Sequence, residues 1–145
     1  MMISKILVAI DGSESALNAA NCAIKLAKQV HATLEIIYVV RYSIGNITAG
    51  IMPFEIEDDE KEKAIKIIQK IKINNPTIKI TDFETIGLPL PEIIKLTEDW
   101  DAELIIIGHH THNFFEKLFT SSVESNLLDN LHIPIMIIPK KYNCR

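Results

Sequence analysis

Hydrophobic and polar positions divide the chain into two alternating kinds of segment: short continuous runs of β-branched residues, and longer stretches with helical spacing. The apolar runs predict strands over residues 5–10, 33–40, 78–86, 103–107 and 133–138. Apolar residues at three- and four-residue intervals predict helices over 14–30, 55–73, 91–100 and 122–131. Ser13, followed by acidic Glu14, is a suitable N-cap for the first of these helices.

Strict alternation of strands and helices indicates βαβ units, hence a parallel sheet with helices on both faces. Most strand candidates are continuous apolar runs rather than alternations of apolar and polar residues, which is typical of strands buried on both sides. The chain has 145 residues, a usual size for one domain. The pattern therefore predicts a doubly wound α/β fold, with residues 1–145 forming a single domain.

Charge and composition exclude several classes of protein. A formal net charge of −4 supplies no basic field for holding nucleic acid. The apolar runs fall far short of the ~20 residues that span a membrane, and the first ten residues have no signal-peptide cleavage site. Cys22 and Cys144 share no metal-ligand spacing, which argues against a zinc site or a disulfide scaffold and favours a reducing cytoplasm. We expect Cys22 to be a small buried hydrophobe, and Cys144 to lie in a frayed tail.

We expect ligand-binding residues in the turns that follow the strands, because doubly wound sheets bind ligands beyond the carboxyl ends of their strands. The first strand ends at Asp11-Gly12-Ser13. The fourth ends at Gly108, and the loop after it opens the last predicted helix at Ser121-Ser122. These two turns are the predicted place of a site.

Several segments resemble the universal stress protein (UspA-like) family along essentially the whole chain. They are KILVAIDGSESA, IIYVV, GLPLPEIIKLTEDWDAELIIIG and IPIMIIPK. The resemblance implies a five-stranded parallel sheet in the order 3-2-1-4-5, which the doubly wound rule and right-handed crossovers also favour. It further implies two helices on each face of the sheet. The fold as a whole is then expected to be adenine nucleotide alpha-hydrolase-like.

Many members of that family bind ATP through a Gly-x2-Gly-x9-Gly-Ser/Thr signature, which falls here on Gly108, Thr111, Ser121 and Ser122. The spacing is kept, but the second and third glycines are replaced. Glycines let backbone approach phosphates, and the helix N-terminus attracts their oxygens. Ser121 and Ser122 can still offer N–H groups, whereas β-branched Thr111 tolerates a positive φ badly.

The resemblance also assigns Asp11 and Val39 as nucleoside contacts, with Asp11 touching a metal only indirectly, through nucleotide-bound Mg²⁺. From the residues alone, Asp11 is equally a turn residue that bonds its neighbouring N–H groups, and Val39 is core. His109, His110 and His112 are interpreted as surface or phosphate-side groups, because such close positions rarely direct three rings to one ion.

Two functions stay open. One is a dimeric stress-response module that binds ATP, with Mg²⁺, or AMP. The other is a family member without nucleotide binding that acts as a dimeric interaction protein for an unidentified partner. Residues 133–138 would pair across the two-fold axis of the homodimer, as the resemblance implies.

No general base is identifiable, so at most slow ATP hydrolysis is expected. A phosphoacceptor receiver domain is excluded, because the third strand ends in Ile86-Gly87 rather than an aspartate.

Overall fold

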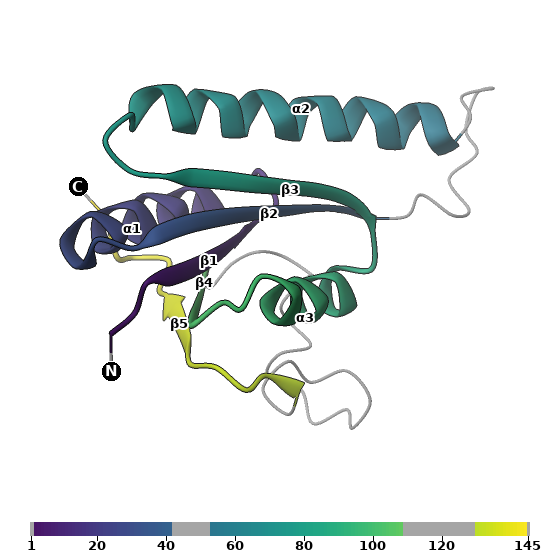
Figure 1. Ribbon diagram of the computed structural model, residues 1–145. Coiled ribbons are helices and arrows are strands. Elements are labelled where there is room, and N and C mark those ends of the chain that lie inside the picture. The colour runs from purple at the N-terminus through teal and green to yellow at the C-terminus, as the bar shows by residue number, and fades with distance from the viewer. Residues whose placement is uncertain (1, 42–52, 109–129, 145) are drawn as a thin grey trace.

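The computed structural model of the chain describes residues 2–41, 53–108 and 130–144 (Figure 1). Its elements, in chain order, are β1 (Lys5–Ile10), α1 (Glu14–Val30), β2 (Thr33–Arg41), α2 (Pro53–Asn74), β3 (Ile80–Gly87), α3 (Pro89–Asp99), β4 (Leu104–Gly108) and β5 (Ile135–Ile138). Each of the five predicted strands is present. The predicted last helix, 122–131, lies almost wholly outside the described residues.

The five strands form one sheet in the order β3-β2-β1-β4-β5, and every neighbouring pair is parallel. The predicted topology is confirmed, with β1 in the centre. From β1 the chain adds β2 and then β3 on one side, and crosses to the other side of β1 for β4 and β5 (Figure 1). The order of strands therefore reverses between β1 and β4.

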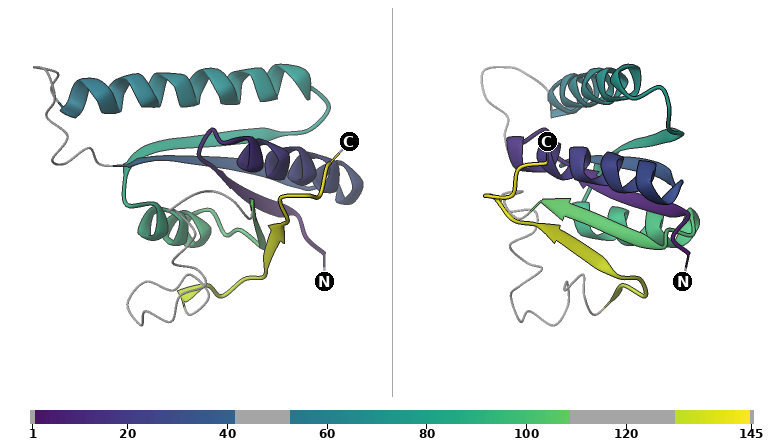
Figure 2. Two further views of the ribbon diagram at one scale, coloured as in Figure 1. Left: turned by 180° about the vertical axis from the view of Figure 1, so that it is seen from behind. Right: turned by 90° about the vertical axis from the view of Figure 1, so that its left-hand side faces the viewer.

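Both faces of the sheet are covered, as continuous apolar strands require. α1 and α2 pack on one face, where the core includes Ile6, Val8 and Ile36 together with Ala64 and Ile68 of α2. α3 packs on the other face, against Leu7, Ile37 and Ile105 among others (Figure 2). The second helix expected on the α3 face is the one outside the described residues.

Prolines explain the clearest differences between predicted and observed boundaries. β5 begins at Ile135 rather than at residue 133, because Pro134 has no N–H to donate; only its carbonyl pairs, accepting from the Ile105 N–H at 3.1 Å. α3 begins at Pro89, two residues earlier than predicted, because the fixed φ of proline suits the first turn of a helix.

The prediction of a frayed C-terminal tail is wrong. After β5 the chain turns back along α1, and Cys144 forms a disulfide with Cys22, with 5.4 Å between the two Cα atoms. Cys22 is buried as predicted, but it is not a free thiol. The contact arises because α1 packs against β4 and β5, so the residues that leave β5 meet this helix.

A helix that crosses a membrane must be both long enough and apolar enough to span the hydrocarbon layer. Among residues 2–41, 53–108 and 130–144, no helix meets both requirements.

Candidate functional site

The turn between β1 and α1 is built around Asp11. Its Oδ1 accepts a hydrogen bond from the Ser13 N–H at 2.9 Å, and its carbonyl accepts one from the Tyr38 hydroxyl at 2.9 Å. Gly12 has φ +82°, a conformation that favours glycine. Asp11 therefore does act as a turn residue, although the bond to Ser13 uses only one of its two carboxylate oxygens.

Tyr38 holds this turn from the neighbouring strand. Burial raises the pKa of its hydroxyl, and the negative charges of Glu60 and Asp11 raise it further. The phenol consequently stays protonated and remains a donor to the Asp11 carbonyl at physiological pH. A side chain on Gly12 would place its Cβ 3.0 Å from the Tyr38 hydroxyl, so the turn leaves little room there.

Ser13 caps α1, as predicted. Its backbone is extended, its hydroxyl accepts from the Ala16 N–H at 3.2 Å, and its carbonyl accepts from the Leu17 N–H at 3.0 Å. Glu14 stands in the first turn, where its charge suits the helix dipole.

Gly108 ends β4 directly beside that first turn. A Cβ on Gly108 would lie 2.7 Å from the Ser15 carbonyl oxygen and 2.8 Å from its hydroxyl. Glycine is therefore required here by the close packing of β4 on α1. This explanation needs no ligand, and the sequence did not indicate it, because Ser15 and Gly108 are far apart along the chain.

The sheet register brings three predicted residues to one edge. Ile10 pairs with Tyr38, so Asp11 and Val39 follow at the same level. Gly108 closes β4 on the other side of β1, where the strand order reverses. Val39 is only 3% exposed and packs in the core on the α3 side of the sheet. Its side chain therefore offers almost no open surface to a ligand.

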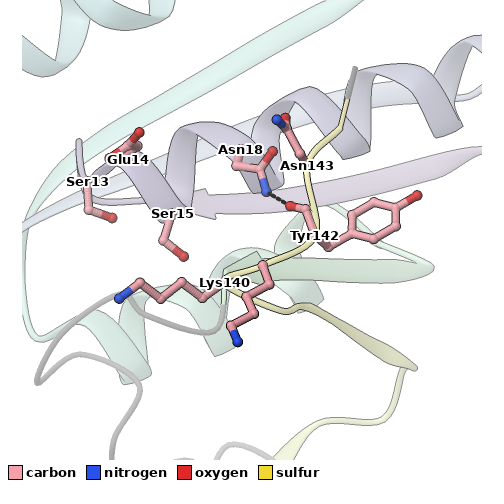
Figure 3. Close-up of a pocket in the computed structure, with 8 residues that line it drawn as sticks. Ser13, Glu14, Ser15, Asn18, Lys140, Tyr142 and Asn143 are labelled. Atoms are coloured by element: carbon pink, nitrogen blue, oxygen red, sulfur yellow. Dashed lines mark hydrogen bonds between the residues drawn. The ribbon is translucent and has the colours of Figure 1, made fainter.

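A pocket of about 660 Å³ opens at this same edge, between the start of α1 and the tail after β5 (Figure 3). It is lined by Ser13, Glu14, Ser15, Asn18, Lys140, Lys141, Tyr142 and Asn143. Figure 3 shows Lys140 extending below the first turn of α1, on the side to which Ser15 points. These two lysines are not among the site residues predicted from the sequence. Their position directly after a strand that ends at the ligand edge was the available signal.

The remaining predicted site residues lie outside the described residues: His109, His110, Thr111, His112, Ser121 and Ser122. Their interpretation is unchanged. Within the part of the chain that the structure describes, no group of three or more His, Cys, Asp or Glu side chains could hold a metal ion.

Ionisable groups also gather at the β3 edge of the sheet, under the end of α2. Lys72 of α2 forms an ion pair with Asp82, and the Thr81 hydroxyl donates to buried Glu35, whose pKa is raised chiefly by desolvation. Burial raises the pKa of Glu84 to about 7, helped by its neighbour Asp82, whose own pKa is lowered chiefly by a hydrogen bond from Glu84. This cluster lies on the β2–β3 strand pair and the end of α2, outside the predicted site.

Comparison with known proteins decides the family. The family model described as "Universal stress protein family" matches residues 2–139. The chain belongs to the universal stress protein family. A curated universal stress protein of Methanocaldococcus jannaschii is 30% identical over 143 residues, covering 96% of this chain and 84% of that protein. Another universal stress protein, from Bacillus subtilis, is 28% identical over 148 residues, covering 94% and 99% respectively.

Solved structures of universal stress proteins share the fold. UspA from Lactobacillus plantarum superposes with a TM-score of 0.78 at 23% identity, over 95% of this chain and 99% of that one. A universal stress protein from Archaeoglobus fulgidus, solved in complex with dAMP, gives 0.59 at 16% identity over 95% and 99%. A further family structure, in complex with cAMP, gives 0.59 at 19% over 95% and 98%.

Proposed function

We propose that this universal stress protein binds an adenine nucleotide, AMP or ATP with Mg²⁺, and acts as a dimeric stress-response regulator in the cytoplasm. Residues 1–145 would form its single domain. The observation that carries the proposal is the meeting of the Asp11 turn and the end of β4 at the point where the strand order reverses. Family members of the same fold have been solved with dAMP and with cAMP, which supports an adenylate as the ligand class.

Each predicted residue has a proposed role. Asp11 would use its carboxylate on the ribose or on nucleotide-bound Mg²⁺, and Val39 would form part of the adenine wall. Gly108 opens the degenerate Gly-x2-Thr-x9-Ser-Ser loop, in which Thr111, Ser121 and Ser122 would follow the phosphates. His109, His110 and His112 would lie on the phosphate side, where a protonated imidazole favours anionic oxygens.

The direct test is to denature freshly purified protein and identify any released nucleotide by chromatography. Calorimetry with AMP and ATP then measures affinity for wild type and for the Asp11→Ala and Ser122→Ala variants. We expect each variant to bind about tenfold more weakly or worse, since a hydrogen bond to a charged group contributes about 1.5–3 kcal/mol.

Asp58→Ala is the matched control, because it removes the same side chain from an exposed position on α2. It should bind as wild type does. Unchanged affinity in both site variants would place the nucleotide elsewhere.

The second candidate is an interaction module without nucleotide binding. It is favoured by the two missing glycines at Thr111 and Ser121, and by the packing of Gly108 on Ser15, which accounts for that glycine without a ligand. Absence of released nucleotide, together with no calorimetric signal for AMP or ATP, would select this function.

For the homodimer, we propose pairing through β5. This strand ends the sheet order, and an apolar edge left bare promotes uncontrolled association. Met136 is 40% exposed there.

Ile135→Lys and Ile137→Lys should shift the mass from light scattering to that of a monomer. Phe83→Lys is the control for adding a lysine to an edge strand, since Phe83 lies on the opposite edge strand, β3, and is 40% exposed, as Met136 is on β5. A dimer that survives both β5 substitutions would overturn this interface.

A further inference from the structure

Two independent sets of contacts fasten the tail after β5 to α1. The first is the disulfide between Cys22 and Cys144. The second is the amide of Asn18, one helical turn before Cys22, which donates to the Tyr142 carbonyl and accepts from the Cys144 N–H at 3.1 Å (Figure 3). The Tyr142 N–H donates to the Pro139 carbonyl at 3.1 Å, which forms the turn that directs the tail onto the helix.

The two cysteine residues differ in their exposure to solvent. Cys22 is 8% exposed, within the core between α1 and the sheet, whereas Cys144 is partly exposed on the tail. A soluble thiol or disulfide reagent can therefore reach Cys144 first. When Cys144 is released, Cys22 keeps its place in the helix, so the partner for reclosing is held in position.

The fastened tail also forms one wall of the pocket at the N-terminus of α1. Lys140 and Lys141 lie between β5 and the Asn18 contact, and they line the pocket opposite Ser13 and Ser15. Without the disulfide, the contacts among the described residues that would still hold these lysines there are the two hydrogen bonds of Asn18, one exposed and one partly buried, the Pro139 turn and the packing of Cys144. Such a small set of local contacts opens at less cost in free energy than the core does.

We propose that Cys22 and Cys144 form a reversible redox latch that fixes the tail along α1 when oxidised and frees it, with the lysine wall of the pocket, when reduced. Disulfides in reducing compartments are mostly transient and redox-sensing, which is consistent with a pair whose outer sulfur is accessible. The latch does not depend on nucleotide binding.

Closure proceeds by exchange with a small-molecule disulfide such as oxidised glutathione. The Cys144 thiolate attacks one sulfur of this oxidant and displaces the first small thiolate, leaving a mixed disulfide on Cys144. The Cys22 thiolate then attacks the Cys144 sulfur, the bond between Cys22 and Cys144 forms, and the second small thiolate leaves. Two electrons pass from the protein to the oxidant, and the two thiol protons are taken up by the released thiolates. A small thiol reverses both steps.

The test equilibrates the full chain in glutathione buffers from strongly reducing to strongly oxidising. Alkylation with mass detection counts free thiols, and hydrogen exchange follows the tail amides of Tyr142 and Cys144. We expect one reversible transition between two free thiols and none, with exchange in the tail at least about tenfold slower in the oxidised protein. Amides of β1 should stay far better protected than the tail amides in both states, because they exchange only when the whole fold opens.

Two variants separate the disulfide from the hydrogen bonds. Cys144→Ser should show fast tail exchange in every buffer, whereas Asn18→Ala should still close its disulfide under oxidation. Three results would each overturn the latch: free thiols that persist in the most oxidising buffer, a disulfide that resists the most reducing one, or equal tail exchange in both states. Loss of β1 protection to the level of the tail on reduction would also overturn it, because the whole fold would then open together with the tail.

Discussion

Gly108 occupies a position where packing alone requires glycine. The resemblance to the family assigns this residue to the approach of backbone to phosphates, which stays a prediction. In the structure, the position of its absent side chain is occupied by the carbonyl and hydroxyl of Ser15. A contact between residues so distant along the chain has no local signature, so the sequence alone could not supply it.

Gly108→Ala should therefore destabilise the protein even without any ligand. The new Cβ would lie 2.7 Å from backbone that belongs to the first turn of α1, and that backbone can move only by shifting the helix. Overpacking of this kind costs about 1–3 kcal/mol of unfolding free energy. Urea denaturation of nucleotide-free protein measures it.

Gly87→Ala is the matched control for this substitution. There the nearest atoms belong to the side chain of Glu92, at 3.0 and 3.1 Å, and a flexible side chain can turn away. Its cost should be clearly smaller. Equal losses for the two variants would contradict the packing role assigned to Gly108.

The raised pKa of Glu84 implies that the stability of the protein depends on pH. Its pKa in the folded protein is about 7, above the ordinary 4.5, because burial and Asp82 disfavour its charged form. Between about pH 4.5 and pH 7 the unfolded chain releases this proton before the folded one does, so the folded state loses stability as pH rises. Glu84→Gln should remove this loss and stabilise the protein at pH 8 relative to wild type.

We expect a gain of roughly 1 kcal/mol at pH 8, below the full value of the shift because Glu84 is partly exposed and water screens its charge. Urea denaturation at pH 5 and pH 8 gives the comparison. Glu62→Gln, at an exposed position on α2, should follow the wild-type profile. A Glu84→Gln profile parallel to wild type would show that Glu84 titrates normally in the folded protein.

At the scale of elements, the apolar runs of the chain located β1, β2, β4 and β5, because strands covered on both faces are mostly apolar. The edge strand β3, ITDFETIG, is mostly half-buried and carries several polar residues. The ends of the elements were less predictable. β5 starts two residues later than predicted, because Pro134 has no N–H to donate to the sheet. α3 starts two residues earlier than predicted, because proline is favourable in the first turn of a helix. The strand order was predictable because the doubly wound rule leaves few arrangements and the resemblance selects among them.

The N-terminus of α1 is one element whose stability can be tested directly. Ser13→Ala removes the hydroxyl that accepts from the Ala16 N–H, and should lower the unfolding free energy by about 0.5–2 kcal/mol. Ser13→Asp should restore most of this loss, since an aspartate side chain accepts the same bond. Thermal or urea denaturation of both variants is the measurement, and an Ala variant as stable as wild type would show that the cap contributes nothing.

At the scale of the whole molecule, the path of the tail after β5 was not predictable from the sequence. Cys22 and Cys144 are separated by 122 positions, and only the path of the chain after β5 brings them together. Two cysteines without a spacing motif gave no local evidence for a bond. The same path carries Lys140 and Lys141 to the pocket, so the residues missed at the candidate site and the missed disulfide have one cause.

A cross-link over most of the chain should contribute strongly to stability. It restricts the unfolded chain, in which a long loop would otherwise be free, and the usual contribution is about 2–4 kcal/mol. Oxidised wild type should therefore exceed Cys144→Ser in unfolding free energy by that amount in urea denaturation without reductant. With a strong thiol reductant present throughout, the two proteins should converge, because neither then carries the bond. A difference that persists in reductant would mean that the packing of the Cys144 side chain, rather than the cross-link, stabilises the fold.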